Sequence, residues 1–412
     1  MAAKSEFFTV QPVSTVLETL FAQWTPPLRF ETLDPRAALG RMLARAPRSS
    51  VDLPSFRRST VDGYAVRAAD TFGASQSLPA YLRIVGSVAM GEAAQGDIGV
   101  GEALAIHTGG MLPMNADCVV MVERTQRFGK DELEVLAPVA AGENVVQIGE
   151  DVRQAAEVLP AGHRLRAQDI GGLLAAGILR VDVALKPRIG LLSSGDELIP
   201  PDETPQLAQI RDINAHTLAA LLTEAGAEPV LLGIARDELD DFRAKAQAGF
   251  ERCDMLVITA GSSVSTRDLT VEVVAGLGSP GVLQHGLAVK PGKPTIIALC
   301  EGKPVIGLPG NPVSAFLVGR QLILPMIQRF LGEKVGPKGV VRAILSANIA
   351  SSSGREDTVP VKLVERDGKM FAEPVFGKSN LIFTLVNADG LVIIPLNLTG
   401  LKAGTEVEVT LF

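Results

Sequence analysis

The alternation of strand and helix patterns between residues 188 and 331 is the feature that most limits the possible folds of this chain. Apolar, β-prone runs alternate there with segments of helical periodicity. Such an alternation is typical of a parallel sheet with helices on both faces, so we predict a doubly wound α/β domain over residues 186–334. The expected strands are Arg188–Leu192, Pro229–Ile234 and Met255–Thr259, and the expected helices are Asn214–Ala225 (capped by Asp212 or Asn214), Leu239–Phe250, Leu269–Ala275 and Pro312–Leu331.

The segments on either side of this domain have other patterns. Residues 14–46 and Ala167–Gly177 show helical spacing, whereas short β-prone runs punctuated by glycine fill residues 52–148. We therefore predict a small β module, residues 52–148, inserted into a helical N-terminal linker module made of residues 1–51 and 149–185. Residues 339–412 show only β patterning after a short linker and predict an all-β barrel or sandwich.

The composition indicates a packed, multidomain globular protein. Of the 412 residues, 47% are hydrophobic and 21% are charged, and the length predicts two to four domains. Aromatic residues make up only 4%, and the net charge is −7, which together argue against general nucleic-acid binding because bases need stacking platforms and basic surfaces. Any anionic ligand must therefore be held by local lysines, arginines and backbone N–H groups.

Cysteine, histidine and the N-terminal sequence exclude several classes of protein. The three cysteines (Cys118, Cys253 and Cys300) form no Cys-x-x-Cys pair, which favours buried thiols in a reducing compartment. None of the four histidines has metal-ligand spacing or a Ser-His-Asp context, so covalent catalysis is not indicated. The N-terminus lacks the apolar region of a signal peptide, and Arg320 interrupts the longest apolar helix. We expect a cytoplasmic protein with no membrane-spanning segment.

Two proline- and glycine-rich turns flank one apolar hairpin near residue 300. The first is Lys290-Pro291-Gly292-Lys293-Pro294, and the second, Leu308-Pro309-Gly310-Asn311-Pro312-Val313-Ser314-Ala315, opens the final helix. Proline stiffens such turns and glycine lets a ligand approach the backbone. Because lysines and a helix N-terminus attract anions, we predict a site for a phosphate-like anion. The alternative is two ordinary turns between strands.

Serine, glycine and acidic residues follow three other predicted strands. Ser193–Glu197, Ala235–Glu238 and Ala260–Ser263 are expected at the carboxyl edge of the sheet, where ligands of such folds bind. Hydroxyl and N–H groups there could hold a phosphate, and carboxylates could hold Mg²⁺. The alternative is that these residues only shape turns and that Asp268 caps the helix that follows it. The carboxylates that qualify for acid–base or metal roles are Asp62, Asp151, Glu197, Asp237 and Asp268.

A set of motifs along the whole chain resembles a known family. The motifs are Ser59-Thr60-Val61-Asp62-Gly63-Tyr64-Ala65-Val66, His107-Thr108-Gly109-Gly110, Ala116-Asp117-Cys118-Val119-Val120, Gly149-Glu150-Asp151, Ser194-Gly195-Asp196-Glu197-Leu198, Arg211-Asp212-Ile213-Asn214, both turns described above, and Ser379 with Asn387-Ala388-Asp389-Gly390. In their order and their context they are similar to the molybdopterin molybdenumtransferases, the MoeA family, to which the C-terminal part of gephyrin is related.

The resemblance implies a homodimeric enzyme of molybdenum-cofactor biosynthesis. Its reaction would insert molybdate into the dithiolene of adenylylated molybdopterin, with Mg²⁺-dependent cleavage of the pyrophosphate and release of AMP. The β module of one subunit would face the α/β domain of the other at the active site. Molybdopterin adenylyltransferase would supply the substrate, and apo-molybdoenzymes or cofactor-delivery proteins would receive the product.

The resemblance also implies roles for individual residues. The catalytic residues would be Asp62, Thr108, Asp151, Glu197, Asp237, Asp268, Lys290 and Lys293. Of these, Glu197, Asp237 and Asp268 would also hold Mg²⁺. The molybdopterin and oxyanion would be bound by Ser194, Gly195, Asp196, Gly261, Ser263, Pro294, Pro309, Gly310, Asn311, Pro312, Ser314, Arg355 and Ser379.

Some positions depart from the family pattern. Ala260 and Ser265 stand where the family usually has glycine, and Gly286 stands where it often has a basic residue. These departures bear on the shape of the pterin-phosphate pocket. They leave open a scaffold or cofactor chaperone that binds molybdopterin without turnover, and a weaker alternative is a variant that inserts tungstate.

Overall fold

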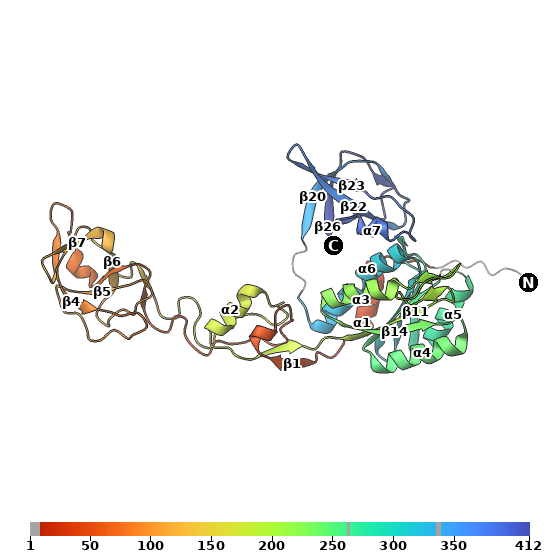
Figure 1. Ribbon diagram of the computed structural model, residues 1–412, viewed down its shortest axis with the longest axis horizontal. Helices are drawn as coiled ribbons and strands as arrows, with labels where there is room; N and C mark the ends of the chain where they lie inside the picture. The colour runs from red at the N-terminus through yellow and green to blue at the C-terminus, as the bar shows by residue number, and fades with distance from the viewer. Residues whose placement is uncertain (1–8, 262–263, 335–338) are drawn as a thin grey trace, which may run out of the picture. The chain divides into compact units, whose positions relative to one another are not determined.

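The computed structural model describes residues 9–261, 264–334 and 339–412, with only the backbone described for residues 264–268 (Figure 1). The described chain divides into two compact units: Met1–Glu31 with Ala184–Phe412, and Thr32–Val183. The four predicted modules are a finer division than this, and their bounds stay a prediction.

A six-stranded mixed sheet forms the centre of the first unit. Its strand order is β14 (Glu228–Ala235), β11 (Arg188–Ser194), β15 (Met255–Ala260), β19 (Lys303–Pro309), β18 (Ile296–Cys300) and β16 (Pro280–His285). The first four strands are parallel, as predicted, but β18 runs antiparallel to both of its neighbours, β19 and β16, so the prediction of a parallel sheet is wrong at this edge. The reason is the tight turn at Glu301 and Gly302, which reverses the chain directly; a parallel neighbour would need a long crossover.

Helices cover both faces of this sheet, as predicted. α4 (Leu239–Arg252) and α5 (Val264–Ala275) share one core cluster with the sheet, in which Phe242 is completely buried. α3 (Asn214–Ala225) packs against α6 (Pro312–Leu331), which also contacts α1 (Val13–Gln23). Asp212 accepts a hydrogen bond from the Ala215 N–H at 3.3 Å and is therefore the capping side chain of α3.

The helical prediction for residues 14–46 is wrong beyond Gln23. The chain forms strand β1 (Phe30–Leu33), which pairs with β10 (Val181–Ala184), and then only a single 3-10 turn, η1 (Pro35–Ala37). The prolines at 26, 27 and 35 account for the difference, because proline lacks the N–H that an α-helix interior requires. The second predicted helix of this region is confirmed as α2 (Ala167–Ala175).

The predicted β module is a six-stranded sheet with an apolar core on each face. Its strand order is β6 (Cys118–Met121), β3 (Gly63–Val66), β5 (Glu102–Ile106), β4 (Ala80–Ser87), β8 (Glu132–Val135) and β7 (Thr125–Phe128). Cys118 lies in one of these cores, and all three cysteines of the chain are buried and free, as predicted.

The C-terminal region is a closed five-stranded barrel. Of the two predicted forms, barrel and sandwich, the barrel is therefore confirmed. Its strands are β22 (Glu356–Arg366), β23 (Lys369–Pro374), β20 (Val340–Leu345), β26 (Glu406–Leu411) and β24 (Gly390–Ile394), and pairing of β24 with β22 closes the ring. The short strand β17 (Val289–Lys290) adds to β22 in parallel, so the first lysine-bearing turn is joined to the barrel by backbone pairing. The barrel also carries a short helix, α7 (Phe383–Val386).

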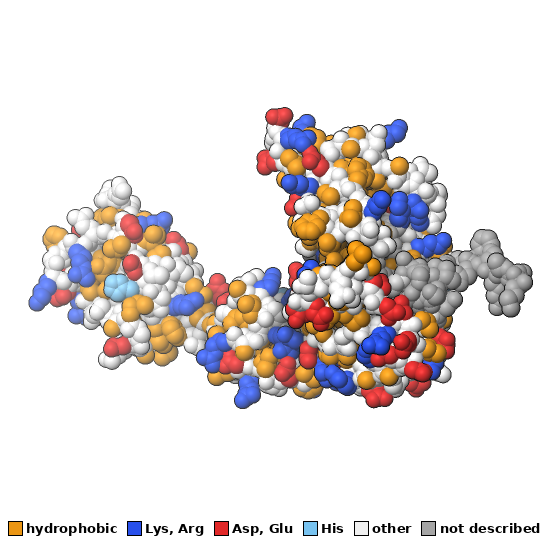
Figure 2. Space-filling model, turned by 45° about the vertical axis from the view of Figure 1, so that its right-hand side comes forward, with side chains coloured by type: hydrophobic (Ala, Val, Ile, Leu, Met, Phe, Trp, Pro, Cys, Tyr) orange, Lys and Arg blue, Asp and Glu red, His pale blue; other side chains and the backbone are white. Residues whose placement is uncertain are grey.

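No helix in the described parts of the chain is long and apolar enough to cross a membrane. Basic and acidic side chains are interspersed over the face of the molecule seen in Figure 2. Attraction of an anion to this face therefore depends on local groups, as the net charge of −7 already suggested.

Candidate functional site

The carboxyl ends of four strands meet at one edge of the central sheet. Ser194 at the end of β11 is in register with Ala235 of β14 and with Ala260 of β15, and Ala260 is in register with Pro309 of β19. Strand β18 is antiparallel and begins at this same edge. The loops that sequence reasoning singled out therefore converge, as a parallel sheet requires.

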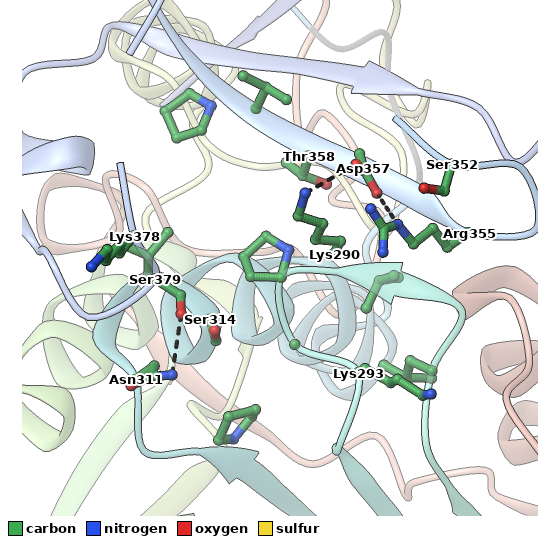
Figure 3. Close-up of a pocket in the computed structure, with 18 of the residues that line it drawn as sticks. Lys290, Lys293, Asn311, Ser314, Ser352, Arg355, Asp357, Thr358, Lys378 and Ser379 are labelled. Carbon is green, nitrogen blue, oxygen red and sulfur yellow. Dashed lines mark hydrogen bonds and ion pairs between the residues drawn. The ribbon is translucent and has the colours of Figure 1, made fainter. Parts of the chain in front are cut away.

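A cavity of about 820 Å³ lies beside this edge, between the first turn, the N-terminus of α6 and the C-terminal barrel (Figure 3). Cationic and hydroxyl side chains from all three elements line it. The predicted site residues that the structure brings together here are Lys290, Lys293, Pro294, Pro309, Asn311, Ser314, Arg355 and Ser379.

The first turn owes its shape to Gly292. This residue has φ +107°, and a Cβ atom there would lie 2.1 Å from Cγ2 of Val318 in α6, so only glycine fits. The Thr295 hydroxyl donates to the Gly292 carbonyl at 2.7 Å and closes the turn. The turn is thus packed against α6, while the side chains of Lys290 and Lys293 remain exposed at the cavity.

Asp357 is a buried carboxylate within this cationic cavity that sequence reasoning missed. Its Oδ1 atom lies 2.9 Å from Nε of Arg355, and its Oδ2 atom lies 3.9 Å from Nζ of Lys290. The residue is only 3% exposed. No local signal singles out Asp357 in the sequence, because it follows Arg355 and Glu356 in a charged run at the start of its strand. Ser352, Thr358 and Lys378 also line the cavity and were also missed.

The second turn holds the N-terminus of α6 against the barrel. The side-chain amide of Asn311 donates to Oγ of Ser379 at 3.1 Å, and the N–H of Val313 donates to the Ser379 carbonyl at 3.1 Å. Gly310 approaches the neighbouring strand so closely that a Cβ atom would lie 2.9 Å from the carbonyl oxygen of Ala260. Ser314, in the first turn of α6, is buried and faces the cavity.

A second group of predicted residues gathers at the ends of β11 and β14. The Ser194 hydroxyl donates to Oδ1 of Asp237 at 2.8 Å, and the Asp237 N–H donates to Oδ1 of Asp196 at 3.2 Å. Gly195 and an exposed Glu197 belong to the same loop. Gly261 lines a separate small pocket with Pro294 and Pro309.

Two predicted residues of this edge lie outside what the structure describes: Ser263 altogether, and Asp268 in its side chain. Among the described side chains, no group of three acidic, histidine or cysteine residues is arranged to hold a metal ion. Glu197 and Asp237, the described members of the predicted Mg²⁺ set, supply only oxygen ligands. Such a set suits Mg²⁺, which proteins usually bind through one or two carboxylates together with substrate phosphates.

The β module contains a separate cluster around Asp62. Oδ1 of Asp62 accepts hydrogen bonds from the N–H of Thr108 at 2.7 Å and from its hydroxyl at 3.2 Å, and it lies 3.5 Å from Nδ1 of His107. The Thr108 backbone bond, more than any other contact, lowers the pKa of Asp62, so this exposed carboxylate stays ionised. The third predicted residue of this unit, Asp151, is also exposed and donates its N–H to the Leu53 carbonyl at 3.0 Å.

Three family models match successive parts of the chain. The MoeA N-terminal region (domain I and II) matches residues 11–177, a probable molybdopterin binding domain matches residues 190–329, and the MoeA C-terminal region (domain IV) matches residues 342–412.

Similar proteins cover nearly the whole chain. A putative molybdopterin biosynthesis protein of Methanocaldococcus jannaschii is 36% identical over 91% of this chain and 90% of its own length. The molybdopterin molybdenumtransferase of Bacillus subtilis is 31% identical over 91% of this chain and 88% of its own. A solved structure of a molybdopterin biosynthesis MoeA protein from Pyrococcus horikoshii matches with a TM-score of 0.83 and 37% identity, covering 98% of this chain and 99% of the other. The chain therefore belongs to the MoeA family of molybdopterin molybdenumtransferases, transferases of molybdenum-cofactor biosynthesis.

Proposed function

We propose that this protein inserts molybdate into the dithiolene of adenylylated molybdopterin and releases AMP by hydrolysis of the pyrophosphate. The observation that carries the proposal is the 820 Å³ cavity in which Lys290, Lys293 and Arg355 surround space next to a helix N-terminus. Its volume lies in the range of small-molecule sites, and its charge suits a ligand with several anionic groups.

The oxyanion would bind in the part of this cavity that Lys290, Lys293 and Arg355 line. Molybdate is a compact dianion, and fixed cations with hydroxyl donors can replace its hydration shell. Lys290, Lys293 and Arg355 supply the positive charge, and Ser379 supplies a hydroxyl. Because the whole chain carries a net charge of −7, binding depends on this local concentration of cations.

The pterin and its phosphate would lie along the second turn and the start of α6. A helix N-terminus presents backbone N–H groups and a partial positive charge to a phosphate. Ser314 and Asn311 flank this end of the cavity. Gly310 keeps the backbone open to close approach.

Hydrolysis of the pyrophosphate consumes one water and yields AMP and the phosphate of molybdopterin. A bound Mg²⁺ would neutralise charge that develops on the phosphate oxygens. Glu197 and Asp237 are the described residues that would hold it, together with Asp268, whose side chain lies outside the described residues. The hydrogen bond from the Ser194 hydroxyl orients the Asp237 carboxylate, and the Asp237 N–H in turn donates to Asp196 of the same loop.

We further propose that the active protein is a homodimer in which Asp62 and Thr108 of one subunit complete the site of the other. The Thr108 bonds hold the Asp62 carboxylate ionised and oriented, which is what a residue needs to orient water or a cation. The substrate would come from an adenylyl transfer to molybdopterin, and the product would pass to apo-molybdoenzymes or to delivery proteins.

The test is a defined assay with purified protein, adenylylated molybdopterin, molybdate and Mg²⁺. We expect AMP release above a protein-free control and reconstitution of an apo-molybdoenzyme, with both activities lost when the divalent metal is chelated. Tight binding of the substrate without AMP release would instead identify a scaffold. Faster turnover with tungstate than with molybdate would identify a tungstate-inserting variant.

A further inference from the structure

The carboxylate of Asp357 places a negative charge in the cavity that is proposed to bind a dianion. Asp357 lines the cavity with Lys290, Lys293 and Arg355, yet its carboxylate would repel a bound oxyanion. The side chain of Asp357 is 5% exposed, so it is a fixed part of the wall. Because the charge of Asp357 opposes binding of the oxyanion, any favourable contribution of this residue to binding must come through its neighbours.

The two oxygens of Asp357 are each directed at a different cation. Oδ1 accepts from Nε of Arg355 at 2.9 Å, and Oδ2 lies 3.9 Å from Nζ of Lys290. Figure 3 shows the three side chains pointing toward one another from two parts of the chain. Asp357 uses Nε of Arg355, and no other described residue bonds to the guanidinium, so both Nη groups are left for an oxyanion.

The position of this carboxylate is fixed by backbone pairing as well. Lys290 and Asp357 are register partners in the β17–β22 pair, and the Glu356 N–H donates to the Ala288 carbonyl at 2.8 Å. Behind the strand, the amide of Gln321 in α6 donates to Glu356 at 3.2 Å and to the hydroxyl of Thr358 at 3.0 Å. Both sequence neighbours of Asp357 are therefore held by α6.

We propose that Asp357 is a positioning residue that orients Arg355 and Lys290 for a tetrahedral oxyanion. Long basic side chains have many rotamers, and their order must be established before they bind a ligand efficiently. The carboxylate restricts both side chains in the free protein, so that binding the oxyanion requires less further ordering. This proposal rests on the proposed function, since molybdate is the oxyanion in question.

A rival explanation predicts the opposite change in oxyanion affinity when Asp357 is removed. If Asp357 only reduced the positive charge of the cavity, its removal would tighten the binding of any oxyanion. If Asp357 positions the two cations, its removal weakens binding although the cavity becomes more positive. The change in oxyanion affinity therefore distinguishes the two explanations.

The experiment is calorimetric titration of the full chain with molybdate. We expect Asp357→Ala to weaken binding about tenfold or more, the scale on which outer partners of ligand-binding side chains act. Asp357→Asn keeps an acceptor for Nε of Arg355 and should lie between that variant and the wild-type protein. Glu373→Gln is the matched control, because it removes a carboxylate that pairs with Arg366 on the same barrel but does not line the cavity. It should bind molybdate as the wild-type protein does.

A second comparison tests whether Asp357 acts through its partner. In an Arg355→Ala background, Asp357→Ala should weaken binding by only about threefold or less, since coupled residues do not act additively. The inference would be overturned, and the proposed function left intact, if Asp357→Ala and Asp357→Asn both bound molybdate as tightly as the wild-type protein or more tightly. Thermal melting would first show that both variants are folded. If the wild-type protein binds inorganic phosphate but not molybdate, the proposed function fails and the same comparison is made with phosphate. A wild-type protein that binds neither anion contradicts both proposals.

Discussion

A side-chain hydrogen bond between Asn311 and Ser379 joins the start of α6 to the C-terminal barrel, next to a second bond from a backbone N–H of α6. The Asn311 amide donates to the Ser379 hydroxyl, and the Val313 N–H donates to the Ser379 carbonyl, both at 3.1 Å. One wall of the cavity is therefore built from residues 68 positions apart in the chain. The side-chain bond can be removed without removing the backbone bond.

We predict that Asn311→Ala impairs substrate binding more than stability. A single hydrogen bond contributes about 1 kcal/mol to the free energy of unfolding, and the backbone bond to Ser379 is retained. The KM for adenylylated molybdopterin should rise about tenfold, equivalent to about 1.4 kcal/mol. Steady-state AMP release measures this effect. The control is Asn348→Ala, which removes a bond to the Ala403 N–H elsewhere in the barrel and should leave KM unchanged. A normal KM for Asn311→Ala would exclude the residue from the binding site.

Mixed dimers test whether the site is shared between subunits. Asp62→Asn removes the charge held by Thr108, and Lys293→Ala removes a cation of the cavity; we expect each variant to fold and dimerise but to lose turnover. A mixed dimer would contain one site with both defects and one intact site. Unfolding and reassembling the two variants together should therefore restore activity, whereas each variant treated alone should stay inactive. Absence of any restoration in a verified mixed dimer would refute the shared site.

The central domain could be predicted from sequence because its signals are local. Periodicity identified β11, β14, β15 and the four helices of residues 188–331, although α5 begins five residues before the predicted Leu269, and the ends of parallel strands then had to meet at one edge. The helical prediction over residues 14–46 failed where prolines outweighed apolar spacing beyond Gln23.

The cavity itself was only partly predictable. Lys290, Lys293 and the second turn carry their own signals as clusters of lysine, proline and glycine. Asp357 does not, because its importance arises from ion pairs with Lys290 and Arg355 that form only when β17 joins the barrel. A contact between residues 290 and 357 depends on how the domains pack, which local patterning does not encode.

Asp169 is expected to stabilise the second unit in a pH-dependent way. The Arg166 side chain, followed by His163, holds the pKa of this buried carboxyl well below its usual range. Since the folded pKa lies below the unfolded pKa, the stabilisation is present above about pH 4 and is lost as the pH falls toward the folded value.

We predict that Asp169→Asn lowers the melting temperature of this unit at pH 7 by about 4 to 8 °C, because hydrogen bonds to charged groups contribute about 2 kcal/mol. The difference from wild type should shrink below about pH 4, and calorimetry over a pH series measures both effects. The control is Asp182→Asn, whose pair with the exposed Arg45 should contribute less than about 1 kcal/mol. An equal loss of melting temperature in Asp169→Asn and Asp182→Asn would contradict the assignment of this stabilisation to Asp169.

Gly292→Ala should disrupt the first turn. The new methyl group would meet Val318 at 2.1 Å, and the φ angle of +107° is unfavourable for alanine. We expect a loss of about 2 kcal/mol in stability and weaker molybdate binding, because the lysines move with the turn. Gly339→Ala, where nothing lies within 4 Å of the added atom, should change neither property. Wild-type affinity in Gly292→Ala would mean that the shape of the turn does not control the site.

The most direct test of the central claim is reconstitution of an apo-molybdoenzyme by three forms of this protein, supplied with adenylylated molybdopterin, molybdate and Mg²⁺. The forms are the wild type, Lys293→Ala, and Lys369→Ala, which removes an exposed lysine of the barrel that does not line the cavity. We predict full reconstitution by the wild type and by Lys369→Ala, and a loss of about a hundredfold in Lys293→Ala, the scale of removing a group that stabilises transition-state charge. Reconstitution by Lys293→Ala at the wild-type rate, or none by the wild type, would contradict the account.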